Sequence, residues 1–135
     1  STDVRRVPAI KALVGHRLEV FVGVDDAIVE AIPVGAVGWV AGLVCAFPKE
    51  TVAIWKLAEA GKFAEARAIY RWFEPLLTLD VTPQLVQNIK LVEAIAIQSN
   101  DRCRAPRIAL SGAERTRIEG IVKTALAKRP ALPTL

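Results

Sequence analysis

Two short apolar runs, residues 18–23 (LEVFVG) and 38–44 (GWVAGLV), dominate the hydrophobic pattern of the first half of the chain. Both are rich in branched and aromatic residues and end in turn chemistry, which is typical of buried strands. Each run is followed by a segment with helix-like spacing. We therefore predict two strands over these ranges.

Three helix-like segments surround the predicted strands. Segment 3–15 ends at a glycine, and Pro8 within it indicates either a kink or a later helix start. Segment 25–35 opens with two acidic residues, which suit a helix N-terminus. Segment 48–61 begins with a proline and ends with a glycine, the usual asymmetry of helix ends. Alternation of helix and strand predicts a parallel α/β arrangement.

The second half of the chain has helical periodicity throughout. Apolar positions repeat at helical spacing over residues 62–77, and Thr82–Pro83 predicts the start of another helix. Ser111 followed by Glu114 predicts a capping box for a last helix, which should end at Pro130. The chain is therefore expected to end in a three-helix region.

A parallel sheet of two strands is incomplete. Parallel strands are normally buried on both faces, and a two-stranded sheet leaves both edges open. We infer that further strands come from a larger chain or from another polypeptide.

Composition indicates a folded, soluble protein. The chain has 135 residues, of which 53% are hydrophobic and 24% charged, so it can form one core. No apolar run approaches the roughly 20 residues that a membrane-spanning helix needs, and the charged N-terminus does not resemble a signal peptide. We therefore expect no membrane association and a cytoplasmic location.

Neither the net charge nor the cysteines indicate a specific binding site. The net charge is +4, and the basic surplus lies late in the chain, where no aromatic residue follows Phe73. This favours a solvated helical face over a nucleic-acid surface, with attraction of an anionic substrate as the alternative. Cys45 and Cys103 lack zinc-ligand spacing, so no metal is expected, and a disulfide between them stays open.

Several segments in order resemble the last part of the dihydrodipicolinate synthase and N-acetylneuraminate lyase family. They are STDVRRV, VGVDDAIVEAIPVGAVGWVAGLVCAFPKE, LAEAGKFAEARAIYRWFEPLL, VQNIKLVEAI and RAPRIALSGAER, which together cover essentially the whole chain. Members of this family are (β/α)8 barrels with a C-terminal three-helix extension, and they form Schiff bases with 2-oxo acids.

The resemblance implies an α/β fold consisting of the last part of a TIM (β/α)8 barrel. On this interpretation residues 1–61 form the C-terminal quarter of the barrel, with strands 7 and 8 and their flanking helices. Residues 62–135 form the C-terminal helical extension. A complete barrel takes roughly 250 residues, so the first six strands would lie upstream.

The Schiff-base lysine of the family is not expected within this chain. Laid over STDVRRV, it falls about three residues before Ser1, so the resemblance assigns no catalytic residue here. The lysine amine attacks a ketone, and the iminium acts as an electron sink. This chain alone is therefore predicted to be inactive.

The resemblance does imply substrate-binding positions. Gly23 and Val40 match residues that line the methyl side of bound pyruvate, although Gly23 also suits a tight turn after its strand. Asp25 and Asp26 match acidic residues that contact the hydroxylated tail of sugar acids, although both would also serve as helix N-caps. Gly42 stands where the sugar-acid lyases carry a serine.

The predicted function is that of a class I lyase, completed by the N-terminal part of the barrel. Its substrate would be pyruvate or a related 2-oxo acid, and the reaction an aldol condensation or cleavage, a dehydration or a deamination. The resemblance implies no cofactor, no metal and a homotetramer. The alternative is a non-catalytic assembly or binding module derived from a truncated barrel.

Overall fold

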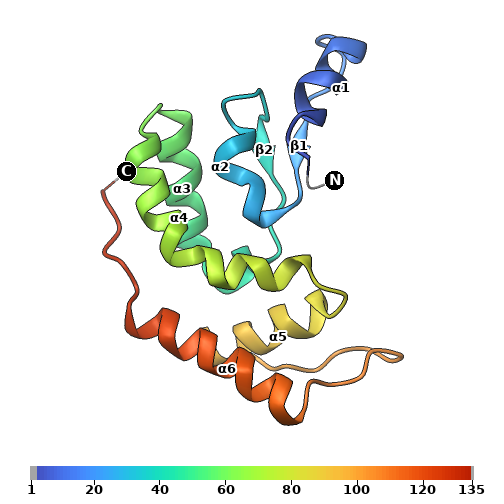
Figure 1. Cartoon of the computed structure of the whole chain (residues 1–135), viewed down its shortest axis with the longest axis vertical. Helices are drawn as coiled ribbons and strands as arrows, with labels where there is room; N and C mark the ends of the chain where they lie inside the picture. The colour runs from blue at the N-terminus through green and yellow to red at the C-terminus, as the bar shows by residue number, and fades with distance from the viewer. Residues whose placement is uncertain (1–2, 135) are drawn as a thin grey trace.

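The computed structural model describes residues 3–134 and places two short parallel strands among helices (Figure 1). Strand β1 (Phe21–Val22) pairs residue for residue with β2 (Gly38–Trp39). Two more backbone hydrogen bonds flank the pair, from Val37 N to Val20 O (3.0 Å) and from Val40 N to Val22 O (2.8 Å). The parallel pairing predicted from the sequence is confirmed, although both strands are shorter than expected.

The helical elements follow in the predicted order. They are α1 (Arg6–Val14), η1 (Asp25–Ala27), α2 (Ile28–Ala31), η2 (Leu43–Cys45), α3 (Pro48–Glu59), α4 (Phe63–Leu77), η3 (Thr78–Val81), α5 (Leu85–Ala96) and α6 (Gly112–Ala127). Helix α1 begins late, so Pro8 lies in its first turn and causes no kink. Gly15 follows α1 with a φ of 60°, a conformation that glycine adopts without strain.

Three local predictions are wrong. The strand expected over 38–44 ends at Trp39, and Leu43–Cys45 form a 3₁₀ turn instead. The helix expected over 25–35 is a 3₁₀ turn followed by four α-helical residues. Ser111 precedes α6 but makes no capping hydrogen bond with its side chain. Glu114 pairs with Arg117 (2.7 and 3.0 Å) instead of completing a capping box.

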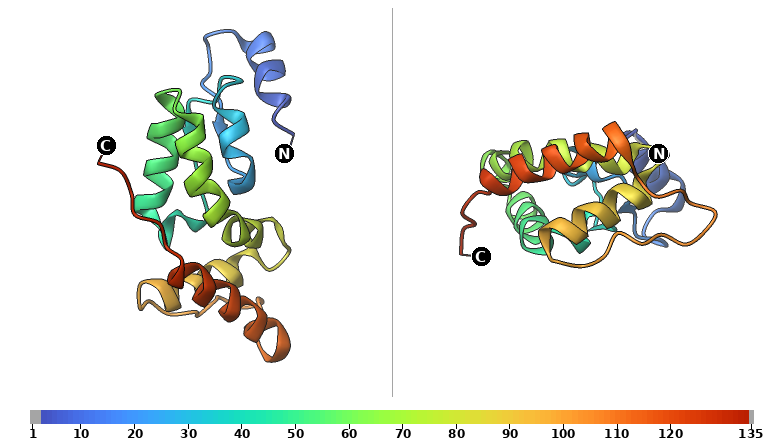
Figure 2. Two further views of the ribbon diagram at one scale, coloured as in Figure 1. Left: turned by 60° about the vertical axis from the view of Figure 1, so that its left-hand side comes forward. Right: turned by 90° about the horizontal axis from the view of Figure 1, so that it is seen from below.

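One hydrophobic cluster joins the strand region to the helical region. Its buried members come from both sides of residue 61 and include Ile28, Leu43, Phe47, Ile54, Leu57, Phe73, Leu76, Leu91, Ile118 and Val122. Helices α3 and α4 lie side by side, while α5 and α6 lie together at the other end of the molecule (Figure 2). The domain division at residue 61 stays a prediction, since this cluster crosses it.

The C-terminal tail returns from α6 toward α3 (Figures 1 and 2). Arg129 donates to the carboxylate of Glu50 at 2.5 Å and lies over the ring of Phe47, 5.4 Å from its centroid. Glu50 is buried, so this ion pair neutralises a charge inside the fold. Leu132 packs against the core farther along the tail.

The two faces of the strand pair have different surroundings. Val20 and Val22 pack against the small cluster of Val7 from α1, Ala31 from α2 and Ala36 from the connection between α2 and β2. On the other face, the side chain of Phe21 is 56% exposed and that of Val40 is 67% exposed. Helices therefore cover one face of the sheet, and apolar residues of the other face contact solvent. Within residues 3–134, no helix is both long and apolar enough to span a membrane.

Candidate functional site

The carboxyl ends of β1 and β2 lie side by side because the strands are parallel and in register. Residues 23–26 follow β1 and residues 40–43 follow β2, so all five sequence-predicted site residues belong to these two connections. The structure thus brings together positions that are up to 19 residues apart in the sequence. The five residues have different roles in the structure.

Asp25 links the two connections. Its carboxylate accepts hydrogen bonds from the backbone N–H groups of Gly42 (3.0 and 3.1 Å) and Leu43 (2.9 Å). The indole N–H of Trp39 donates to the same carboxylate at 3.3 Å. Burial raises the pKa of the Asp25 carboxyl, and these hydrogen bonds act in the opposite direction. Asp25 therefore holds the end of the second strand against the first.

This geometry explains why the second strand is short. The amides of residues 42 and 43 point at Asp25, so they are not available to a strand ladder. It also corrects the expectation that Asp25 and Asp26 cap their own helix, since neither makes a capping hydrogen bond with its side chain. A substrate contact for Asp25 stays a prediction. Its fully buried carboxylate is already held by three donors of the chain.

Asp26 is held through its backbone. Its carbonyl oxygen accepts a hydrogen bond from the Tyr70 hydroxyl at 2.5 Å, which ties the strand end to α4. Burial raises the pKa of Tyr70 to about 12, and the nearby carboxylates of Glu30, Glu74 and Asp26 act in the same direction. Tyr70 therefore stays protonated near neutral pH and joins α4 to the strand end. The Asp26 side chain is half-buried.

A hollow of about 580 Å³ lies over the two strand ends. It is lined by Gly23, Val24, Val40, Ala41, Gly42, Asp80, Val81, Thr82, Leu85 and Ile89. Three of the predicted substrate-binding residues, Gly23, Val40 and Gly42, thus border one cavity. Asp25 and Asp26 are not among its lining residues. Val24 and Ala41 come from the same two connections, and the other lining residues come from η3, from the first turns of α5 and from the connection between them.

Gly42 is closely packed against residues of η3 and α5. A Cβ atom at residue 42 would lie 2.4 Å from Oδ1 of Asp80 and 2.8 Å from Cδ1 of Ile89. Only a residue without a side chain fits there unless these neighbours move. Gly23 is different, because a Cβ atom there would meet only the carbonyl oxygen of Val40, at 3.9 Å. Packing alone therefore does not require a glycine at residue 23.

Asp80 is a pocket residue that the sequence reasoning missed. It lies in η3, and partial burial raises its pKa to about 6, with the negative charges of Asp25 and Asp26 acting in the same direction. The only feature of the local sequence that could have identified Asp80 is its place, as an acidic residue, just before the helix start at Thr82–Pro83. The contact with the strand end depends on how η3 folds back, which local sequence does not reveal.

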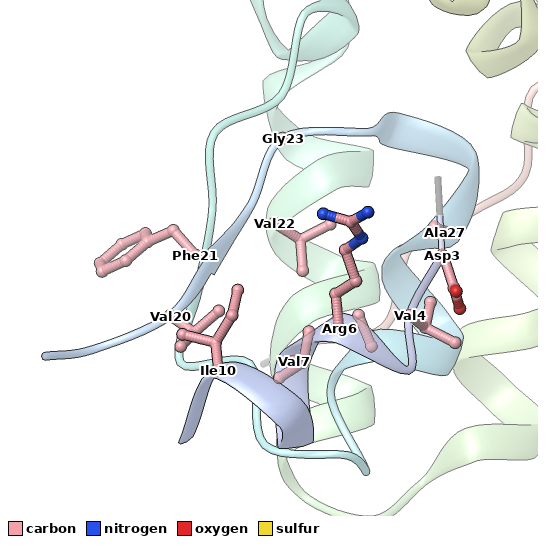
Figure 3. Close-up of a pocket in the computed structure, with 11 residues that line it drawn as sticks. Asp3, Val4, Arg6, Val7, Ile10, Val20, Phe21, Val22, Gly23 and Ala27 are labelled. Carbon is pink, nitrogen blue, oxygen red and sulfur yellow. The ribbon is translucent and has the colours of Figure 1, made fainter. Parts of the chain in front are cut away.

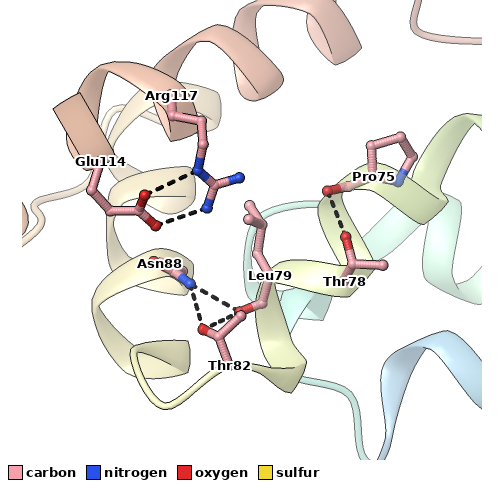
Figure 4. A network of polar contacts seen from close by, with 7 residues as sticks. All are labelled: Pro75, Thr78, Leu79, Thr82, Asn88, Glu114 and Arg117. Atoms are coloured by element: carbon pink, nitrogen blue, oxygen red, sulfur yellow. Dashed lines mark hydrogen bonds and ion pairs between the residues drawn. The ribbon is translucent and has the colours of Figure 1, made fainter.

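A hydrogen-bond network holds η3 in place (Figure 4). The buried Asn88 of α5 donates to Leu79 O at 3.0 Å and to Thr82 Oγ1 at 2.9 Å. Thr82 donates in turn to Leu79 O at 3.3 Å. Asn88 thereby ties Leu79 and Thr82, which lie on either side of Asp80, to α5.

A second, smaller hollow of about 230 Å³ lies between α1 and β1. Its lining is mainly aliphatic, and the Arg6 side chain reaches into it beside Val22, while Phe21 points away (Figure 3). Within residues 3–134, β1 pairs with β2 alone. This hollow therefore borders the edge of β1 that β2 does not cover.

Lysines and metal-binding groups are not gathered at the strand ends. None of the lysines lines the larger hollow, and Lys11 donates to Gly35 O (3.1 Å) before the start of β2. Among residues 3–134, no three His, Cys, Asp or Glu side chains lie close enough to hold a metal ion. Cys45 and Cys103 are free thiols, which answers the open question of a disulfide.

Several solved structures are similar to this chain. The dihydrodipicolinate synthase from Oceanobacillus iheyensis matches with a TM-score of 0.79 and 21% identity over 93% of this chain and 44% of its own. The 4-hydroxy-tetrahydrodipicolinate synthase from Methylacidiphilum fumariolicum matches with a TM-score of 0.77 and 25% identity, over 93% of this chain and 43% of its own. The Ruminococcus gnavus sialic acid aldolase matches with a TM-score of 0.74 and 22% identity, over 95% and 44%.

These likenesses are consistent with part of a (β/α)8 barrel, and the chain spans less than half the length of each of these structures. No curated protein matches the chain significantly in sequence. Residues 1–125 match the model of the dihydrodipicolinate synthetase family. That match covers more than nine-tenths of the sequence, and the chain therefore belongs to the dihydrodipicolinate synthetase family.

Proposed function

We propose that this chain forms part of the active-site wall of a Schiff-base lyase that acts on pyruvate or a related 2-oxo acid. The observation that carries the proposal is the hollow over the ends of β1 and β2. Enzymes with (β/α)8 barrels keep their active sites at the carboxyl ends of the strands. On this proposal β1 is the seventh strand of the barrel and β2 the eighth.

The reacting lysine is proposed to lie upstream of Ser1. Its amine would add to the ketone and release water, and the resulting iminium would accept the electron pair left at the neighbouring carbon. One matched structure is that of the Ruminococcus gnavus sialic acid aldolase with its catalytic lysine mutated, so this relative has a catalytic lysine. Since no lysine of this chain lines the hollow, the chain alone is predicted to be inactive.

The residues of this chain would bind and orient the substrate. Gly23 leaves room for the main chain to approach the ligand, and the exposed side chain of Val40 offers an apolar surface for the methyl end of pyruvate. Asp25 would position Gly42 and the backbone of the pocket floor. Asp26 stays a candidate for contact with the substrate tail.

The rest of the site would come from the N-terminal part of the barrel, in the same or a separate chain. The exposed apolar face of the strand pair and the uncovered edge of β1 support this, since barrels bury such faces and edges. We further propose a homotetramer without an organic cofactor or metal, working in the cytoplasm.

The proposal is tested by treating the protein, together with its natural upstream sequence, with pyruvate and borohydride. The intact mass should increase by one reduced pyruvyl group per active site, because borohydride traps the iminium irreversibly. Borohydride without pyruvate is the control. A protein whose mass does not change at saturating pyruvate would contradict the proposal.

The alternative is a non-catalytic assembly module. The observations that favour it are the buried hydrophobic cluster that this chain forms and the absence of a lysine from the lining of the hollow. The module would bind other subunits through the exposed face of β1 and β2. A natural start codon just before Ser1, with an unchanged mass after trapping, would favour this alternative.

A further inference from the structure

The hollow over the strand ends contains a single charged side chain. Of the ten residues that the described structure places along it, only Asp80 carries a charge. Thr82 has the one other polar side chain, and the remaining eight residues are glycine, alanine or larger aliphatic residues. The polar character of the cavity therefore depends mainly on one carboxylate.

That carboxylate has unused hydrogen-bonding capacity. Among residues 3–134 it makes no hydrogen bond or ion pair, whereas Asp25 nearby is held by three N–H donors. An ionised carboxylate accepts several hydrogen bonds and donates none. It can therefore receive donors from a molecule in the hollow.

Asp80 also occupies a definite place over the strand end. Its Oδ1 lies where a side chain of residue 42 would project, since a Cβ atom there would approach it to 2.4 Å. The absent side chain of Gly42 thus leaves room for the Asp80 carboxylate from the opposite wall. The network around Asn88 and Thr82 fixes the backbone of η3 that carries it.

We propose that Asp80 determines specificity in this pocket, by accepting hydrogen bonds from hydroxyl groups of the substrate tail and by repelling tails that end in a second carboxylate. This inference rests on the proposed function and deepens it. A like charge placed against a fixed carboxylate is strongly disfavoured, while hydroxyl donors gain a charge-assisted hydrogen bond.

The test compares two 2-oxo acids in the borohydride trapping of the protein with its natural upstream sequence. The probes are 2-oxo-3-deoxygluconate, whose tail carries hydroxyl groups, and 2-oxoglutarate, whose tail ends in a carboxylate. The half-saturating concentration for adduct formation is measured for each. The wild type should be trapped at lower concentrations of the hydroxylated probe.

Asp80→Asn preserves the shape of the side chain and removes the charge. The ratio of the two half-saturating concentrations should shift about tenfold or more toward 2-oxoglutarate. Glu59→Gln, at an exposed position in α3 that does not line the hollow, is the charge-matched control and should leave the ratio unchanged.

A second measurement keeps the inference testable if Asp80→Asn does not fold. Between pH 7 and pH 5 the wild-type ratio should shift toward 2-oxoglutarate, because Asp80 takes up a proton near its pKa of about 6. The elements packed against η3 also carry Asp25 and Asp26 in η1, Glu74 in α4, and Lys90 and Glu93 in α5, which pair with each other at 3.0 Å.

The outcomes separate the two proposals. No adduct with pyruvate in the wild type would overturn the proposed function itself. Adducts with pyruvate in the wild type and in Asp80→Asn, with a probe ratio changed less than about twofold, would overturn only the role of Asp80. Rejection of the hydroxylated probe by a wild type that traps pyruvate would also overturn it.

Discussion

Two acidic residues near the strand ends are used in opposite ways. Asp25 follows β1, is fully buried and is surrounded by N–H groups of Trp39, Gly42 and Leu43. Asp80 comes from the helical region, lines the hollow and has no hydrogen-bond partner among residues 3–134. A carboxylate saturated by the chain holds the structure together, and an unsaturated one is available to a ligand. The comparison predicts different consequences of mutating each.

The largest effect is expected at Asp25. Asp25→Ala would leave the N–H groups of Gly42, Leu43 and Trp39 without their acceptor in a buried place, which costs about 3 kcal/mol of unfolding free energy. Urea unfolding of the purified protein measures this loss. Asp26→Ala is the neighbouring control, because Asp26 accepts the Tyr70 hydrogen bond through its backbone. Equal losses for the two variants would contradict the role given to Asp25.

A smaller effect is expected at Gly42, which lies against Asp80. Gly42→Ala should cost about 1 to 2 kcal/mol, because the new methyl group would collide with Asp80 and Ile89. In a double-mutant cycle, Asp80→Ala should remove part of that cost. Additive losses in the cycle would mean that Gly42 and Asp80 are not in contact.

The next effect is the pH dependence of the unfolding free energy that Asp80 causes. The folded-state pKa of Asp80 is raised to about 6 from 3.8, so the native state binds the proton more tightly than the unfolded state does. Its ionisation therefore destabilises the fold above about pH 6, and this penalty disappears as the pH falls toward 4. After allowance for solvent screening, we expect the penalty to be about 1 kcal/mol.

Urea unfolding at pH 7 and pH 4.5 measures this penalty as the difference between the wild type and Asp80→Asn. The variant should be more stable than the wild type at pH 7, and the gap should narrow at pH 4.5. A gap that widens at the lower pH would contradict the raised pKa.

The smallest effect is expected at Asp26. Asp26→Asn should change the unfolding free energy by less than about 0.5 kcal/mol, since no hydrogen bond or ion pair to its side chain is seen among residues 3–134. It should nevertheless lower the pKa of Asp80, because the Asp26 charge contributes to raising it. Carboxyl titration by NMR measures that shift.

The contrast between the two carboxylates also marks how far the sequence predicts this structure. Helices α3 and α4 were predicted well, since their apolar stripes and end residues act locally. The second strand was predicted to reach residue 44, but Asp25 draws the amides of Gly42 and Leu43 out of the ladder. That contact joins positions 17 and 18 residues apart, and no local pattern reveals it.

The same limit applies to the candidate site. Gly23, Val40 and Gly42 were found through the family resemblance, and the structure places all three on one hollow. Asp80 was missed because its approach to Gly42 depends on the fold of η3 against the strand ends. The predicted capping box failed for a local reason instead, since the Arg117 side chain, three residues after Glu114, binds its carboxylate.

The most direct test of the central claim is to map the position of the trapped pyruvyl group by peptide mass spectrometry. The account predicts one modified lysine, upstream of Ser1, and no reduced adduct on any lysine of this chain. A specific adduct on Lys11, Lys90 or another lysine of residues 1–135 would contradict the proposal that this chain supplies only the wall of the site.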